Sequence, residues 1–127
     1  MPRVQVNSAS LQPPAVPQAS YEAIILKVDY PFVAPWDDGT GEPDTGTDWH
    51  VQITEDGAQK GRRVNQFATT TEGKNFSTRY GKFCKGIGVD PDDWETELVE
   101  GMEVMVEIST YESKGVTRNG IQSLLKR

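Results

Sequence analysis

The sequence is poor in the residues that build covalent, catalytic or metal sites. It contains one cysteine, Cys84, and one histidine, His50. A single cysteine excludes an internal disulfide, and one cysteine with one histidine falls short of the four ligands of a structural zinc site. No Gly-x-Ser-x-Gly motif or phosphate-binding loop occurs in the chain. We therefore expect no catalytic residues, no bound metal or other cofactor, and a protein that is not an enzyme.

The sequence also has no apolar run of about 18 residues, so we expect no membrane contact through a spanning helix. Residues 1–20 lack the basic and apolar regions of a signal peptide, which predicts a cytoplasmic protein. The same segment is rich in proline and shows no apolar periodicity, as is typical of a flexible arm. A chain of 127 residues has room for one core. We expect a flexible N-terminal arm over 1–20 and one folded domain over 21–127.

Charge is distributed unevenly along a chain whose net charge is −6. Residues 57–88 hold seven bases and one acid, whereas residues 89–113 hold nine acids and no base. Binding of a polyanion depends on the local potential of a surface, not on the total charge. The basic segment 57–88 is therefore either a binding surface or an internal counter-charge for the acidic segments.

Five segments have the alternating pattern of β-strands, and turn residues separate them. In the first segment we expect Ile24, Leu26 and Val28 to share the buried face. In the second, Trp49 alternates with Val51 and Ile53, which predicts a buried tryptophan. The predicted strands cover residues 21–30, 48–55, 61–69, 101–111 and 120–127.

One helix is predicted over residues 75–89, between the third and fourth strands. Phe76, Tyr80, Phe83 and Ile87 recur at helical spacing and mark its buried face. Asn75 is the expected N-cap, and Gly86 or Gly88 the expected end. Three strands, a helix and two further strands are the layout of a five-stranded OB-fold barrel, so we expect an all-β protein with one helix.

The start of the third strand is the strongest candidate for contact with nucleic acid. Lys60, Arg62 and Arg63 would meet phosphates, and alternation places Arg63 and Phe67 on one face of the strand. Single-stranded DNA binding needs such cations together with aromatic rings on which bases stack. The alternative is that Phe67 belongs to the core and that the arginines are solvated or paired with acids.

Further candidates come from the loops that flank the binding groove of an OB-fold. They are Phe32 and Trp36 at the long loop 31–48, His50 on the outward face of the second strand, and Tyr111, Lys114 and Arg118 at the last hairpin. For Trp36 the alternative is a ring that covers one end of the barrel. For the hairpin residues it is a solvated turn.

Several strings of the sequence resemble a family of small phage-encoded proteins related to single-stranded DNA-binding proteins, long catalogued as a domain of unknown function. They are YEAIILKVDY (21–30), WHVQITEDGAQKGRRV (49–64), YGKFCKGIGVDPD (80–92), LVEGMEVMVEI (98–108) and SKGVTRNGI (113–121). The resemblance implies an OB-like fold and a role among replication and recombination proteins in the host cytoplasm. Bacterial single-strand-binding proteins recruit partners through an acidic C-terminal tail. This chain ends in Leu-Leu-Lys-Arg, and the acidic segment 89–113 is the expected substitute.

These observations predict a phage-type protein that binds single-stranded DNA, with little sequence preference, in DNA replication or recombination. Replication or recombination proteins are the other expected partners, and a homo-oligomer is one of the expected states. The alternative is a protein-interaction OB module that docks a replication, recombination or host factor through its acidic surfaces. A weaker alternative is an inhibitor that mimics DNA.

Overall fold

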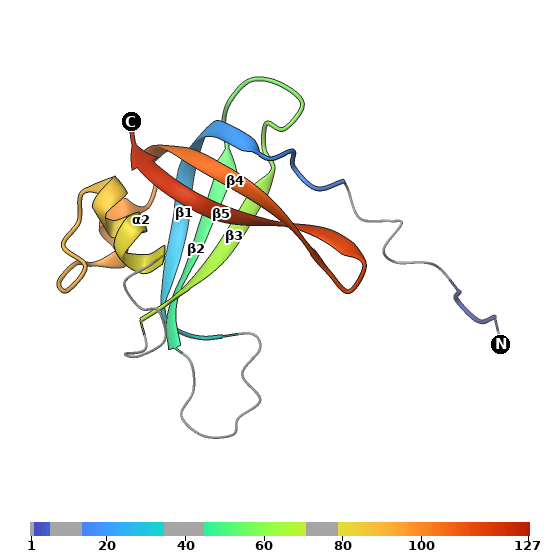
Figure 1. Cartoon of the computed structure of the whole chain (residues 1–127), viewed down its shortest axis with the longest axis horizontal. Coiled ribbons are helices and arrows are strands. Elements are labelled where there is room, and N and C mark those ends of the chain that lie inside the picture. Colours follow the sequence, from blue (N-terminus) through green and yellow to red (C-terminus); the bar gives the residue numbers. More distant parts are fainter. Residues whose placement is uncertain (1, 6–13, 35–44, 71–78) are drawn as a thin grey trace.

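The computed structural model describes residues 2–5, 14–34, 45–70 and 79–127. Within these residues the chain forms a mostly β structure with one α-helix, and the predicted order of strands and helix is confirmed (Figure 1). The strands pair in one antiparallel sheet in the order β3-β2-β1-β4-β5. The elements are β1 (Ala19–Val33), β2 (Thr45–Ile53), β3 (Arg63–Thr69), α2 (Arg79–Ile87), the 3-10 helix η1 (Thr96–Val99), β4 (Glu103–Ser113) and β5 (Val116–Lys126).

The central strand β1 joins the two halves of the sheet, since Ala23 pairs with Ile53 of β2 on one side and with Val104 of β4 on the other. Its register with β2 shifts between Ile25 and Lys27, so an extra residue is inserted there. Such a bulge reverses the alternation of the side chains that follow. The predicted core face is confirmed at Val28, which is buried together with Ala23 and Ile25, and is wrong at Ile24 and Leu26, which are only half-buried.

The core lies between the inner face of the sheet and α2. Trp49 is fully buried on β2, as predicted, and its ring meets the edge of the Phe83 ring at a centroid distance of 5.3 Å. The Trp94 ring stacks on the Trp49 ring at a centroid distance of 5.5 Å. Tyr80 and Ile87 lie on the same buried face of α2, which confirms the predicted stripe within the described part of the helix. Phe76 and Asn75 lie outside the described residues.

Helix α2 packs against β5 at one end of the sheet (Figure 1), and glycine makes the close approach possible. A Cβ atom at Gly86 would collide with the backbone carbonyl oxygen of Leu124. The helix ends at Gly88, whose φ is +79° and whose N–H donates to the carbonyl of Cys84 at 3.0 Å. A left-handed glycine of this kind is the usual helix C-cap.

The two edge strands, β3 and β5, approach each other through a side chain. Gln66 on β3 accepts a hydrogen bond at its Oε1 from the backbone N–H of Ile121 on β5, at 3.2 Å. Gly120 beside it has no side chain, and a Cβ atom there would come too close to the Gln66 oxygen. No backbone ladder joins β3 to β5 in the described part of the chain, so the sheet is not closed and the predicted barrel is not confirmed.

The last residues of the predicted N-terminal arm lie against the domain. Val16 is buried, and its backbone N–H and carbonyl both bond the side-chain amide of Asn119 on β5, each at 2.8 Å. The Tyr21 hydroxyl donates to the carbonyl of Pro17 at 2.7 Å. Strand β1 then begins at Ala19, two residues before the predicted start of the domain.

None of the helices that the structure describes combines the length and the apolar character needed to cross a membrane.

Replacement of Gly86 and of Gly81 by alanine tests the packing of α2 in opposite directions. Gly86→Ala places a methyl group against the Leu124 carbonyl, so we expect the free energy of unfolding to fall by about 1–3 kcal/mol. Gly81→Ala meets no atom within 4 Å and adds a better helix former, so we expect a gain of about 0.5–1 kcal/mol. Urea unfolding followed by far-UV circular dichroism measures both. Equal unfolding midpoints for the two variants would contradict the close approach of α2 and β5.

The buried thiol of Cys84 and the buried phenol of Tyr80, both on α2, predict a loss of stability at alkaline pH. Burial raises the pKa of Cys84 from 9.0 to about 11 and that of Tyr80 from 10.0 to about 12. A folded-state pKa above the unfolded value favours folding below the unfolded pKa, and this contribution disappears as the pH rises through the folded pKa. Wild type should therefore lose stability relative to Cys84→Ala between pH 9 and 11, measured by urea unfolding at each pH. A stability difference that stays constant across this range would contradict the burial of a neutral thiol.

Candidate nucleic-acid interface

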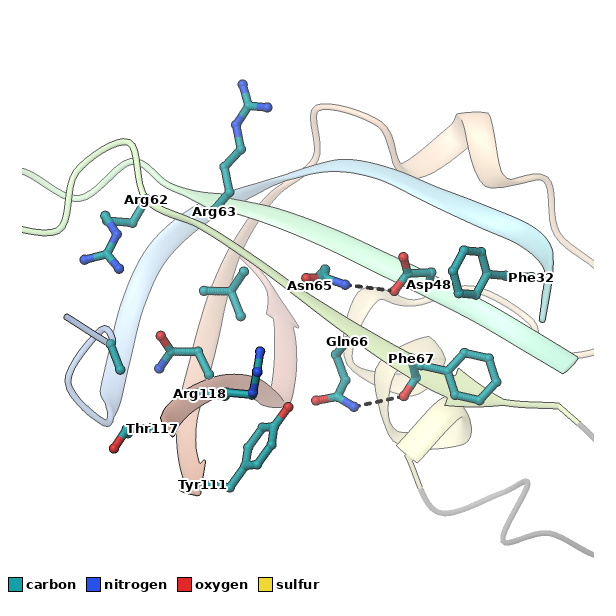
Figure 2. A pocket seen from close by; sticks show the side chains of 13 residues that line it. Phe32, Asp48, Arg62, Arg63, Asn65, Gln66, Phe67, Tyr111, Thr117 and Arg118 are labelled. Atoms are coloured by element: carbon teal, nitrogen blue, oxygen red, sulfur yellow. Dashed lines mark hydrogen bonds between the residues drawn. The ribbon is translucent and has the colours of Figure 1, made fainter. Parts of the chain in front are cut away.

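A groove of about 420 Å³ opens between β3 and the β4–β5 hairpin (Figure 2). We call it the β3–β5 groove. Residues from both edges of the sheet line it, together with Ala15 from the N-terminal segment. Three arginines and three aromatic residues that the sequence predicts to contact DNA lie along its walls: Arg62, Arg63, Arg118, Phe32, Phe67 and Tyr111.

The groove exists because the sheet curls until β3 and β5 face each other. Arg63 and Arg118 are 55 positions apart in the chain, and the bond from Ile121 to Gln66 holds their strands together. On the hairpin wall, Tyr111 of β4 and Arg118 of β5 are directly paired residues. Figure 2 shows these two side chains close together on the hairpin, whereas Arg62 and Arg63 lie at the start of the third strand, with the Arg63 side chain directed away from the hairpin.

The basic side chains of the groove differ in how tightly they are held. Arg63 and Arg118 are exposed. Arg62 is half-buried, and its guanidinium donates to the carbonyl of Pro14 at 2.7 Å and to Gln59 Oε1 at 3.3 Å. Arg62 therefore anchors the N-terminal segment at one end of the groove, while Arg63 and Arg118 point their charge to solvent.

Two predicted cations lie outside the groove. Lys60 pairs with Asp56 at 2.9 Å in the turn between β2 and β3. Lys114 occupies the tip of the β4–β5 hairpin, where a φ of 52°, followed by 76° at Gly115, makes a two-residue turn. Turns with two positive φ angles connect strands directly. The sequence predicts a loop between residues 111 and 120, whereas the strands continue to the turn, so Arg118 lies on β5, and Tyr111 lies on β4 as predicted.

The aromatic residues form one covered pair and one exposed ring. Phe67 is 7% exposed and lies on the outward face of β3, apart from the hydrophobic core. Its ring packs against that of Phe32 at a centroid distance of 6.2 Å and an angle of 45°. Tyr111 is 51% exposed, which makes it the most accessible ring on the groove wall. Trp36 lies outside the described residues.

Polar residues that sequence reasoning missed form the floor of the groove. Asp48 is only 4% exposed, and its Oδ1 accepts a hydrogen bond of 3.4 Å from the Asn65 amide. His50, a predicted contact residue, lies beside Asp48 but does not line the groove. The available signal was alternation: Asp48 and His50 are two residues apart, so they share the outward face of β2. Gln66 and Asn119 gave no comparable signal, because their partners are far away in sequence.

The basic segment 57–88 is not neutralised by the acidic segment 89–113 in the part of the chain that the structure describes. There, its ion pairs are confined to the contact between Lys60 and Asp56. The acids of residues 90–97 are exposed on the segment that includes η1. The charge of Arg63 and Arg118 is therefore available to a ligand in the groove.

No protein-family model matches the sequence, and a search of the curated proteins finds no significant match. The likeness to phage single-strand-binding proteins therefore stays a prediction from the quoted strings, and the function has to be argued from the groove.

Proposed function

We propose that this protein binds single-stranded DNA in the β3–β5 groove with little sequence preference. The observation that carries the proposal is the gathering of arginines and aromatic rings from β1, β3, β4 and β5 along one groove. Proteins that bind single strands without reading their sequence combine a cationic track for the backbone with rings for the bases.

The two walls of the groove supply the cations of that track. Arg63 and Arg118 are both exposed and line the groove from opposite edges of the sheet, so both charges are accessible to a strand that runs along it. The carbonyl of Pro14 already holds Arg62. A strand that reached this end of the groove would compete with the N-terminal segment for that guanidinium.

Tyr111 and Arg118 form the best defined stacking position. As directly paired residues of an antiparallel ladder, their side chains lie next to each other on one face. A base on the Tyr111 ring would place its phosphate within reach of the Arg118 guanidinium. Stacking contributes about 1–3 kcal/mol per base and tolerates any base, because every base has a π-face.

The strand order supports an OB-type barrel as part of this proposal. A partly open OB barrel is expected to have a central β1 that pairs with both β2 and β4 and one helix between β3 and β4. Both features are present here, and Gln66 links the two edge strands. With the resemblance to phage-encoded proteins, this favours a role in replication or recombination.

A protein-interaction module is the second candidate, and one observation favours it. Leu98 on η1 is 69% exposed and stands between the exposed acids Glu97 and Glu100. Exposed charges of one sign are complementary to a surface of opposite charge, so this acidic surface suits a basic protein partner. This surface is separate from the β3–β5 groove, so the two functions can be tested independently.

The double variant Arg63→Ala/Arg118→Ala tests the groove directly. Each phosphate contact on a single strand contributes about 0.7 to the slope of log affinity against log salt concentration. We expect binding of labelled oligo-dT to weaken by more than about tenfold at 0.05 M salt, and the salt slope to become shallower by about 1.4. Fluorescence anisotropy at several salt concentrations measures both quantities.

The matched control is Lys60→Ala/Lys114→Ala, which removes the same charge from outside the groove. It should leave the salt slope close to that of wild type. Equal losses in the two double variants would show that net charge, not the groove, governs binding. An absence of oligo-dT binding by the wild type at low salt would refute the proposed function.

A further inference from the structure

A second polar cluster lies on the outward face of β1 and β2, next to the groove. Asp29 and Asp48 are directly paired residues of the two strands, and His50 follows Asp48 on the same face. The Nε2 atom of His50 is 2.8 Å from Asp48 Oδ2 and 3.4 Å from Asp29 Oδ2. One ligand atom from each of the three residues lies within 4.8 Å of the other two.

His50 Nε2 is the unusual atom of this cluster. It is buried and, although it lies 2.8 Å from Asp48 Oδ2, makes no hydrogen bond with the residues that the structure describes. Asp48 itself is only 4% exposed. A buried nitrogen without a partner beside a buried carboxylate is costly unless something else binds there.

The spacing of the donor atoms fits a metal ion. Around an ion with bonds of about 2.1 Å, two ligands are about 3.0 Å apart at a right angle and about 3.4 Å apart at the tetrahedral angle. The two distances from His50 Nε2, 2.8 and 3.4 Å, are close to these values. One imidazole and two carboxylates are suitable ligands for a divalent first-row ion, because imidazole binds Zn²⁺ well and carboxylates bind Mn²⁺ well.

The surroundings of the cluster contain both a supporting and a competing group. The Asn65 amide binds Asp48 Oδ1 at 3.4 Å, which orients the carboxylate and leaves Oδ2 toward His50. Such outer hydrogen bonds commonly support metal ligands. Lys27 Nζ lies 3.4 Å from Asp29 Oδ2, but its side chain is 53% exposed and is free to move into solvent.

We propose that Asp29, Asp48 and His50 bind a divalent first-row cation such as Mn²⁺ or Zn²⁺, with water in the remaining positions. The site is an open one with three protein ligands. It differs from the four-ligand structural zinc site that the sequence excludes, because two carboxylates take the place of cysteines. With a neutral imidazole, the ion would also balance the two negative charges at the edge of the β3–β5 groove.

Because His50 is the single histidine of the chain, its ring gives an unambiguous NMR signal. Addition of Mn²⁺ alone to the full chain, without DNA, should broaden that signal selectively. Addition of Zn²⁺ should shift it and abolish its titration with protons. Neither measurement depends on the proposed function.

Variants identify the ligands by isothermal titration with Mn²⁺. Asn65→Ala should weaken binding about 10–100-fold, as is usual for an outer-shell partner, and Asp29→Asn and His50→Gln should weaken it further. Lys27→Gln should strengthen binding, and Asp93→Asn, an exposed acid elsewhere, should leave it unchanged. Circular dichroism of each variant confirms its fold.

The competing explanation is a protonated His50 that bridges the two carboxylates. A ring signal that titrates with protons and ignores millimolar Mn²⁺ and Zn²⁺ would overturn the metal site. Undiminished Mn²⁺ binding by both Asp29→Asn and His50→Gln in isothermal titration would overturn it as well, since the ion would then bind elsewhere.

Discussion

The hydrogen bond from the Ile121 N–H to Gln66 Oε1 is the constraint on which the functional surface depends. This bond connects the two edge strands of an open sheet. The Nε2 atom of the same Gln66 side chain donates a second hydrogen bond to the Phe67 carbonyl at 3.0 Å. Because Gly120 has no side chain, β5 can come close enough for this bond. This link joins the strands that carry Arg63 and Arg118, the two opposite edges of the sheet, and the N-terminal segment adds further contacts through Arg62 and Asn119.

The placement of charge follows from the same geometry and explains how an acidic protein can present a cationic groove. Arg63 and Arg118 line the groove with exposed side chains, while the exposed acids of residues 90–97 lie with η1 and do not line it. Asp48 is the exception, since it is a buried acid in the floor of the groove. Its neighbours His50 and Asn65 are the groups available to balance or orient it, which is why this carboxylate connects the groove to the proposed cation site.

The order of the strands and the helix could be predicted from sequence, because alternation and helical spacing are local signals. Trp49 and Phe83 were placed correctly for that reason. The buried face of β1 was not, because the bulge after Ile25 is set by pairing with β2. Arg63, Tyr111 and Arg118 could be proposed from charge and ring type. That Arg63 lines the same groove as the Tyr111–Arg118 pair could not, because it depends on contacts between β3 and β5 such as the bond from Ile121 to Gln66, 55 residues away. Lys114 lies in the last hairpin, as expected from the sequence, but the two-residue turn places it at the tip, outside the β3–β5 groove.

The most direct test of this account is a map of the backbone amides that respond to single-stranded DNA. Isotope-labelled protein would be titrated with oligo-dT while its amide NMR signals are followed. The account predicts that the largest shifts occur at Arg63, Asn65, Tyr111 and Arg118, with no change at Glu97 and Leu98 on η1. Shifts that gather on η1 and spare the β3–β5 groove would contradict it.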